Sequence, residues 1–358
     1  MTGVGMKKQA MAGQATAGQA TIGQATTGQT TKEQATTGAR ADAVAVRDLV
    51  VGSASLTAVR GVSFAIPAGG RMGLVGESGS GKTLTALALM GLLPMGWAAQ
   101  GQVLHDGANL TRQSDRQLAQ RRGRTISMVF QDPLSALDPV RRVGQQVASV
   151  IRRHTGADRA GALRQTVDLF AQMNLPRPDQ MVRAYPHELS GGQRQRIMIA
   201  MALACYPQLI IADEPTTALD VTVQKQVLRI LDAAVRDRGS ALLMITHNLP
   251  IIAAICDSVA VMYAGRIVEI GPVQQVFRHP RHHYTRGLLT SQPTMDNIAL
   301  DGSSRLPSIP GMVPPLHDLP GGCAFHPRCA AATDTCRTTM PELSGSVSQA
   351  ACWHPVGP

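Results

Sequence analysis

One eight-residue stretch has the composition and spacing of a phosphate-binding loop. Residues 76–83 match the pattern G-x-x-x-x-G-K-S/T, in which backbone N–H groups surround phosphate oxygens. The glycines let the backbone approach the phosphates closely. Lys82 can reach the β- and γ-phosphates, and the Thr83 hydroxyl can bind Mg²⁺. We therefore expect ATP to be bound by Gly76, Glu77, Ser78, Gly79, Ser80, Gly81, Lys82 and Thr83.

Two carboxylates follow an apolar run further along the chain. Residues 209–212 read Leu-Ile-Ile-Ala and lead directly into Asp213 and Glu214. Buried strands of α/β proteins deliver functional side chains at their carboxyl ends. Asp213 is expected to hold Mg²⁺, directly or through water, and Glu214 to polarise an attacking water. In isolation such a pair is more often a simple strand end, but after a phosphate loop it predicts hydrolysis.

A second possible anion site lies between these two elements. Ser190, Gly191, Gly192 and Gln193 open an expected helix, and they combine a hydroxyl, two permissive glycines and exposed N–H groups at a helix start. A glycine-rich helix start is common on its own account. Because one nucleotide does not need two such sites in one chain, the second site requires a separate explanation.

The hydrophobic pattern predicts the elements that position these residues. Apolar residues 72–75 indicate a buried strand before the phosphate loop, and the Ala- and Leu-rich run 84–93 indicates a helix after it. We expect antiparallel strands over 43–72, strand and turn over 101–129, helices over 143–184, 192–204 and 221–237, strands at 208–212, 241–246 and 258–262, and a turn at 264–265. Alternating strands and helices predict a parallel α/β sheet.

Composition limits the class of protein. The chain has 358 residues, a net charge of +10 and only 3% aromatic residues, so its core must be mainly aliphatic. Its basic residues are scattered and aromatics do not interleave with them, which argues against a nucleic-acid partner. No run approaches the roughly 18 apolar residues of a membrane span, and the N-terminal region lacks the apolar centre of a signal peptide. We expect a cytoplasmic protein that reaches a membrane only through other subunits.

Three segments are expected along the chain. Residues 1–41 contain a five-residue repeat rich in Gly, Gln, Ala and Thr, which cannot bury enough apolar surface to fold, so we predict a disordered tail. Residues 42–290 carry the three motifs. Residues 291–358 begin with a Pro- and Gly-rich stretch and end in a region that contains four cysteines.

The order of the motifs resembles one family closely. A phosphate loop, then Leu-Ser-Gly-Gly-Gln, then Ile-Ile-Ala-Asp-Glu-Pro is similar to the nucleotide-binding subunits of ABC transporters, over about residues 43–275. The resemblance implies a P-loop NTPase fold of the ABC type, with an antiparallel β subdomain and a helical subdomain at about residues 132–195. It also implies that Gln131 contacts Mg²⁺ and water, that Asp220 lies beside the catalytic site of a dimer, and that His247 contacts the γ-phosphate.

The same resemblance explains the second anion site. In the family two ATPase domains face head to tail, and each ATP lies between the phosphate loop of one chain and the Ser190-type loop of the other. A second ABC ATPase subunit, identical or homologous, is therefore an expected partner. One feature departs from the family: residues 44–63 contain no aromatic residue to stack on adenine. We expect Val51 or Arg60 to take that place, or the contact to be absent.

Two further stretches resemble the oligopeptide/dipeptide importer subfamily. They are residues 131–139, from Gln-Asp-Pro onward, and Tyr-Pro-His-Glu-Leu at 185–189. The resemblance implies an ATP hydrolase at the cytoplasmic face of the inner membrane, working with two integral-membrane permease subunits and, through them, a solute-binding protein. The permease is expected to dock near Gln131 and residues 143–184. Import of nickel or another small solute is the alternative, and a soluble ABC ATPase of DNA repair or translation is less favoured.

The C-terminal cysteines add a separate expectation. Cys323, Cys329, Cys336 and Cys352 also resemble the C-terminal extension of that subfamily. Because persistent disulfides are not expected in the cytoplasm, four thiolates suit either tetrahedral zinc or an iron–sulfur cluster, and their spacing does not decide. The resemblance favours a 4Fe–4S cluster, with Zn²⁺ next and unligated thiols last. Cys205 and Cys256 lie in apolar helix-like segments, and we expect them to be buried and inert.

Overall fold

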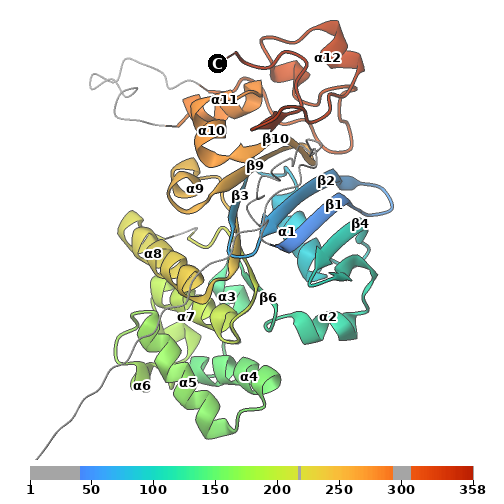
Figure 1. Cartoon of the computed structure of the whole chain (residues 1–358). Coiled ribbons are helices and arrows are strands. Elements are labelled where there is room, and N and C mark those ends of the chain that lie inside the picture. The colour runs from blue at the N-terminus through green and yellow to red at the C-terminus, as the bar shows by residue number, and fades with distance from the viewer. Residues whose placement is uncertain (1–40, 217–218, 293–307, 358) are drawn as a thin grey trace, which may run out of the picture. The chain divides into compact units, whose positions relative to one another are not determined.

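The computed structural model describes residues 41–216, 219–292 and 308–357, and these are the residues discussed below (Figure 1). The predicted N-terminal tail lies outside them except for its last residue. All described residues belong to one unit, Arg40–Pro358. No helix in the described part of the chain is both long enough and apolar enough to cross a membrane.

The strands of a four-stranded antiparallel sheet come from residues on both sides of the phosphate loop in the sequence. Its strand order is β2 (Thr57–Pro67), β1 (Asp42–Gly52), β4 (Ala98–His105) and β5 (Ala108–Asn109). Buried and exposed residues alternate along the second half of β2, as a strand with one solvated face requires. The expectation of antiparallel strands over residues 43–72 is confirmed for this part.

A seven-stranded sheet carries the catalytic motifs. Its order is β11 (Gln349–Ala350), β10 (Arg266–Pro272), β9 (Ser258–Tyr263), β3 (Arg71–Val75), β8 (Ala241–Ile245), β7 (Leu209–Asp213) and β6 (Ile126–Val129). The five strands from β9 to β6 are parallel, and β10 and β11 are antiparallel. The predicted parallel α/β sheet is therefore present. Because β7 and β8 are buried on both faces, they read as continuous apolar runs.

The helices follow the same chain order. They are α1 (Lys82–Met90), η1 (Leu110–Arg112), α2 (Asp115–Arg121), α3 (Pro133–Ala136), α4 (Val143–Thr155), α5 (Arg159–Gln172), α6 (Pro178–Met181), η2 (Pro186–Glu188), α7 (Gly191–Leu203), α8 (Val221–Arg238), α9 (Leu249–Ile255), α10 (Val273–Arg278), α11 (His283–Thr290), η3 (His326–Arg328) and α12 (Asp334–Thr338). The predicted helices 192–204 and 221–237 match α7 and α8 within one residue. Helices α4, α5, α6 and α7 pack on one another beside β6 (Figure 1).

Helix α2 was not expected, since residues 101–129 predicted only strand and turn. The backbone N–H of Ser114 donates to Gln117 Oε1 at 2.9 Å, which caps the helix start. The pattern Ser-x-x-Gln at 114–117 is typical of a helix start and could have indicated this helix. Leu118 is the one apolar residue that directly follows it, however, and a single apolar residue shows no helical period.

Two aliphatic clusters form the core, one on each face of the large sheet. Successive residues of β7 alternate between them: Ile210 and Ala212 face the cluster of α4, α5, α7 and α8, whereas Leu209 and Ile211 face the cluster of α1 and the antiparallel sheet. The large sheet therefore packs against one aliphatic cluster on each of its two faces. Its strand ends are fixed in position by packing on two sides, which is what a precise site requires.

Candidate functional site

The phosphate loop joins β3 to α1, as the sequence predicted. Gly76 has φ 154° and Gly81 φ 100°, and a Cβ at Gly76 would lie 2.2 Å from the carbonyl oxygen of Met262. The Lys82 ammonium donates to the carbonyl oxygens of Gly76 at 2.8 Å and Glu77 at 2.9 Å. Burial lowers the pKa of Lys82, and nearby carboxylates oppose that shift. The ammonium is thus held at the centre of the loop, where phosphate oxygens would lie.

Asp213 lies at the carboxyl end of β7, beside the start of α1. Its carboxylate is bonded by the Thr83 hydroxyl, and its Oδ1 atom is buried without a hydrogen-bond partner. Burial raises the pKa of Asp213, because the charged form is desolvated. An unsatisfied buried carboxylate oxygen next to a hydroxyl fits Mg²⁺, which prefers oxygen ligands.

Glu214 is the point where three segments meet. Its carboxylate accepts from Gln131 Nε2 at 3.5 Å and lies 3.1 Å from His247 Nδ1. Its backbone is left-handed, with φ 43°, and its N–H donates to Ile245 O on β8 at 2.9 Å. Such a conformation is strained for Glu and is often found at functional sites. The fold therefore brings together the three residues expected to be catalytic.

These residues surround one pocket of about 360 Å³. Of the predicted residues, Gly76, Ser78, Gly79, Gly81, Lys82, Thr83, Gln131, Glu214 and His247 line it. Glu77, Ser80 and Asp213 do not line it. Ser80 Oγ instead lies 3.3 Å from Lys82 Nζ, and the Glu77 carboxylate accepts from Arg328.

The second predicted anion site lies elsewhere in the chain. Ser190 caps α7, where its hydroxyl accepts from the Gln193 N–H and its own N–H donates to Gln193 Oε1. Asp220 caps α8 through the N–H groups of Thr222 and Val223. None of Ser190, Gly191, Gly192, Gln193 and Asp220 is among the described residues that line the pocket. Ser190 is thus exposed at the start of α7, and the two glycines lie in the first turn of this helix, outside the phosphate-loop pocket.

Neither residue that was expected to contact adenine lines this pocket. Val51 has no exposed surface, and Arg60 does not line the pocket. The side chains that do line it include Ala58, Trp97 and Leu316. Trp97 follows α1, outside the residues before the phosphate loop among which a stacking aromatic was expected.

The C-terminal region contacts the phosphate loop directly. Arg328 donates to both carboxylate oxygens of Glu77, at 2.7 and 3.1 Å, and its side chain is 5% exposed. The Tyr284 hydroxyl accepts the Glu77 N–H at 2.8 Å. Phe325 packs on the rings of Tyr263 and Tyr284. No sequence pattern indicates this contact, because the two charged residues are 251 positions apart.

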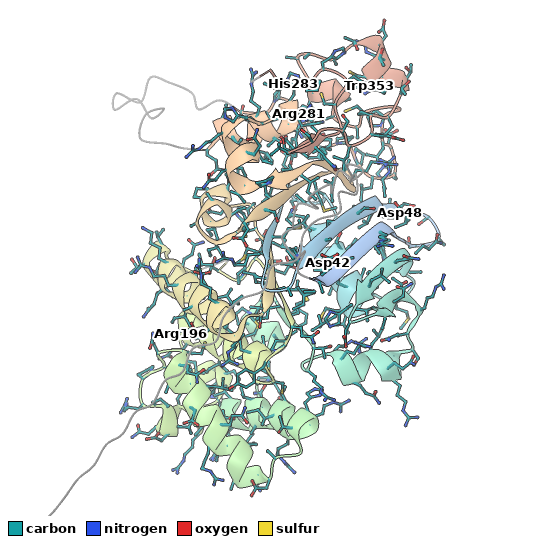
Figure 2. All side chains as sticks on the ribbon, viewed as in Figure 1. Asp42, Asp48, Arg196, Arg281, His283 and Trp353 are labelled. Atoms are coloured by element: carbon teal, nitrogen blue, oxygen red, sulfur yellow. The ribbon has the colours of Figure 1, made fainter. Side chains whose placement is uncertain are left out.

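The four C-terminal cysteines line one small cavity. Cys323, Cys329, Cys336 and Cys352 share it with His283 and Trp353, both labelled in Figure 2. Burial raises the pKa of Cys323 to about 11 and raises those of Cys329 and Cys352. Within the described residues, no three His, Cys, Asp or Glu side chains are grouped closely enough to hold one metal ion. In the described residues the structure therefore gives no support for a metal site at these cysteines, whether for an iron–sulfur cluster or for zinc.

The other two cysteines lie apart from that cavity. Cys256 is buried at the end of α9, and its pKa is raised to about 12, mainly by burial. Cys205 was expected to be buried in a helix, but it follows the end of α7 and is half-buried. The expected burial is confirmed for Cys256 alone, and its expected inertness stays a prediction.

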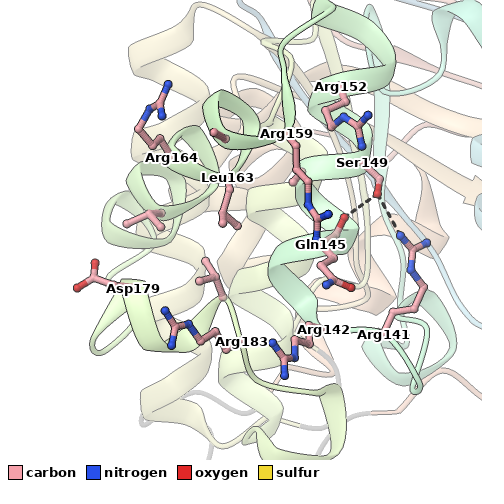
Figure 3. Close-up of a pocket in the computed structure, with 14 residues that line it drawn as sticks. Arg141, Arg142, Gln145, Ser149, Arg152, Arg159, Leu163, Arg164, Asp179 and Arg183 are labelled. Carbon is pink, nitrogen blue, oxygen red and sulfur yellow. Dashed lines mark hydrogen bonds between the residues drawn. The ribbon is translucent and has the colours of Figure 1, made fainter.

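A second cavity lies among α4, α5 and α6 (Figure 3). It encloses about 720 Å³ and is strongly basic, with one acidic residue, Asp179. Arg141 donates to Ser149 Oγ at 3.1 Å, which fixes one edge. The basic groove, as we call it, is lined by six arginines: Arg141, Arg142, Arg152, Arg159, Arg164 and Arg183.

Two family models match the chain. The ABC transporter model covers residues 59–217, and the model named "Oligopeptide/dipeptide transporter, C-terminal region" covers residues 268–336. The first contains the phosphate loop, the Ser190 motif and both carboxylates. The second contains Arg328 and three of the four cysteines.

Individual relatives agree with the family models. A "probable peptide ABC transporter ATP-binding protein" of Sinorhizobium fredii is 47% identical over 86% of this chain and 94% of its own length. An "oligopeptide transport ATP-binding protein" of Haemophilus influenzae is 45% identical, over 79% and 86%. The dimeric ATP-binding cassette MJ0796, solved with ADP and phosphate, superposes with a TM-score of 0.58 at 24% identity, over 64% of this chain and 98% of its own. That likeness concerns the fold alone.

Proposed function

This chain belongs to the ATP-binding proteins of oligopeptide/dipeptide ABC transporters, and we propose how its residues perform ATP hydrolysis. It is the ATPase subunit of a peptide importer. The observation that carries the mechanism is the meeting of Gln131, Glu214 and His247 at the mouth of the phosphate-loop pocket. The relatives' names refer to peptide transport, which favours peptides over nickel as the transported solute.

Each residue has one task in this proposal. The Lys82 ammonium exchanges its bonds to the loop carbonyls for the β- and γ-phosphates of ATP. Thr83 and Asp213 would hold Mg²⁺, which supplies charge neutralisation at the phosphates when bound. Glu214 accepts a proton from the attacking water or orients it, while Gln131 and His247 hold its carboxylate and reach toward the γ-phosphate.

The experiment is the substitution Glu214→Gln, which keeps shape but removes the base. We expect ATP hydrolysis to fall by about 100-fold or more, because general-base catalysis contributes about 10²–10⁴-fold. ATP binding should persist and the dimer should be trapped closed. Glu342→Gln, at an exposed acid in the C-terminal region, is the matched control. Hydrolysis by Glu214→Gln within a few-fold of the unmodified protein would refute the assignment.

A second ATPase chain completes the site in this proposal. In this dimer the second motif would contact the nucleotide that is bound to the partner chain. The residues concerned are Ser190, Gly191, Gly192, Gln193 and Asp220. Support comes from the exposure of Ser190 at the start of α7, outside the pocket of its own chain. ATP-dependent dimerisation of the Glu214→Gln protein, lost in Glu214→Gln/Ser190→Arg, is the expected result.

The basic groove is the surface we assign to the permease. Its six arginines favour a cytoplasmic permease segment that carries Asp or Glu side chains, since complementary charge directs such contacts. We expect Arg152→Glu/Arg159→Glu to lose the permease on purification of the complex, whereas Arg286→Glu on α11 should retain it. Retention by both would show that the permease binds elsewhere. Two permease subunits at the cytoplasmic face of the inner membrane, and a solute-binding protein beyond them, complete the proposed assembly.

For the cysteine cavity we propose a 4Fe–4S cluster as the resident group. Support comes from the four cysteines that line one cavity. Their sulfurs are not grouped to hold a metal as they stand, so binding of either a cluster or zinc would require them to move closer together. Cys323, Cys329, Cys336 and Cys352 would hold the cluster, which would supply cross-linking or redox chemistry. Anaerobic purification should give visible charge-transfer absorbance and iron, lost in Cys329→Ser. A colourless protein with zinc would support the alternative, and one without either metal would indicate free thiols.

A further inference from the structure

Trp97 lines the pocket into which the phosphate loop opens. Among the described residues that line this pocket, it is the one Phe, Tyr or Trp side chain. Ala58 and Leu84 line the same pocket, so the indole shares it with an apolar surface on β2 and at the start of α1. The same pocket is also lined by the polar side chains of Gln131, Glu214 and His247, which face the reacting phosphate in the proposed function.

Strand register explains how Trp97 reaches this point. Ala98, the first residue of β4, pairs with Gly52 at the end of β1, and Gly52 also pairs with Thr57 of β2. Trp97 and Ala58 therefore lie at the same end of the antiparallel sheet. Val51, one of the two residues expected to contact adenine, also lies near this end of β1 but is fully buried.

The local backbone holds the indole in place. The N–H of Trp97 donates to Pro94 O at 3.0 Å, which closes a turn, and Gly96 has φ 82° within that turn. The side chain is half-buried and packs against the aliphatic cluster between α1 and the antiparallel sheet, as Leu84 and Leu93 also do. One part of the side chain is thus anchored by packing, while the rest contributes to the pocket wall.

We propose that Trp97 is the base-stacking residue of this ATP site and takes the place of the missing aromatic of β1. This inference rests on the proposed function, since it concerns the same nucleotide. Stacking of a base on an aromatic ring tolerates any base, because every base has a π-face. Trp97 therefore strengthens binding of ATP and GTP alike, without selecting between them.

The chain offers a direct measurement, because it contains only two tryptophans. Trp353 lies in the C-terminal region, where its Nε1 donates to Thr339 O. In the Trp353→Phe protein, Trp97 is the only tryptophan. We expect its fluorescence to change in intensity and position as ATP saturates the site. Emission that is unaltered at saturating ATP would overturn the proposal without any change to Trp97 itself.

Substitution then separates the base from the phosphates. Trp97→Leu keeps an apolar side chain but removes the flat ring, and we expect it to raise the Kd of ATP by roughly 5- to 150-fold, the equivalent of one base stack. Trp97→Phe should restore most of the affinity. Inorganic tripolyphosphate, which has no base, should bind both variants as it binds the unmodified protein.

The outcomes distinguish this inference from the proposed function. If Trp97→Leu weakens ATP and tripolyphosphate equally, the ring only supports the fold of the pocket and the stacking role is wrong. If neither ligand is weakened, the base lies elsewhere. If the unmodified protein binds neither ATP nor tripolyphosphate, the proposed ATP site itself fails.

Discussion

The Arg328–Glu77 ion pair predicts that the C-terminal region stabilises the phosphate loop. The Arg328 side chain is 5% exposed and that of Glu77 28% exposed, and the two make a bidentate contact at 2.7 and 3.1 Å. Arg328 also donates to Pro310 O at 2.8 Å. The substitution to test is Arg328→Met, which keeps most of the side-chain volume and removes every one of these hydrogen bonds.

The expected cost follows from burial. Removing one partner of a fully buried pair costs about 3–5 kcal/mol, because the remaining charge is left uncompensated. Glu77 retains some contact with water, so we expect about 2–3 kcal/mol. For the described part of the chain, with an unfolding entropy of about 2.1 cal/mol/K per residue, this corresponds to a fall in Tm of about 3–5 °C. Arg328→Lys should recover only part of it, since an ammonium cannot form the bidentate contact.

The assay is a double-mutant cycle with Glu77→Gln, read by thermal unfolding and by the Kd of ATP. A coupling of about 1.5 kcal/mol or more is expected between the two sites, together with weaker ATP binding in each single variant. Arg337→Met is the matched control, because Arg337 pairs with Asp334 at an exposed position, where a pair contributes about 0–1 kcal/mol. A coupling below 0.5 kcal/mol, or ATP binding that is unchanged in Arg328→Met, would refute the reasoning.

Three further predictions concern single residues. Because burial raises the pKa of Asp213, its ionised form destabilises the nucleotide-free protein at every pH above that pKa. Asp213→Asn should therefore raise the Tm of the nucleotide-free protein at pH 7.5 while weakening Mg²⁺-dependent ATP binding. A lower Tm would contradict this prediction. Gly76→Ala should abolish ATP binding in equilibrium dialysis, since its Cβ would meet Met262 O at 2.2 Å, whereas Gly79→Ala, with open space and φ 78°, should retain measurable binding. Cys256, with its pKa raised to about 12, should resist iodoacetamide at pH 8 in the folded protein and react after denaturation, as mass spectrometry of the peptides would show.

The catalytic strands could be predicted because their burial is complete. Strands β7 and β8 have apolar residues on both faces, so each reads as an uninterrupted run with a clear end. The first polar residues after such a run must lie at the edge of the sheet, which placed Asp213 and Glu214 correctly without knowledge of the fold. The same reasoning located the loop between β3 and α1, where glycine positions report the backbone conformation directly.

Contacts between distant segments could not be predicted in this way. Nothing local to Glu77 indicates Arg328, because the pair depends on β10 and the C-terminal region packing beside the loop. Trp97 was missed for a related reason. Its role depends on the pairing of Ala98 with Gly52, which is a property of strand register and not of sequence order.

The nucleotide-free site holds unfavourable charge that binding can relieve. Asp213 has an unsatisfied buried oxygen, and Lys82 has a pKa lowered by burial while its ammonium bonds only neutral oxygens of the loop. Both groups would gain charged partners from Mg²⁺ and ATP. The loop that receives them is already held by Tyr284 through the Glu77 N–H and by Arg328 through the Glu77 carboxylate, so little backbone order remains to be acquired. The free energy of binding therefore comes chiefly from Lys82 and Asp213, the groups that change partners. A change that loosens Glu77 would weaken binding, because part of that free energy would then be spent on reordering the loop.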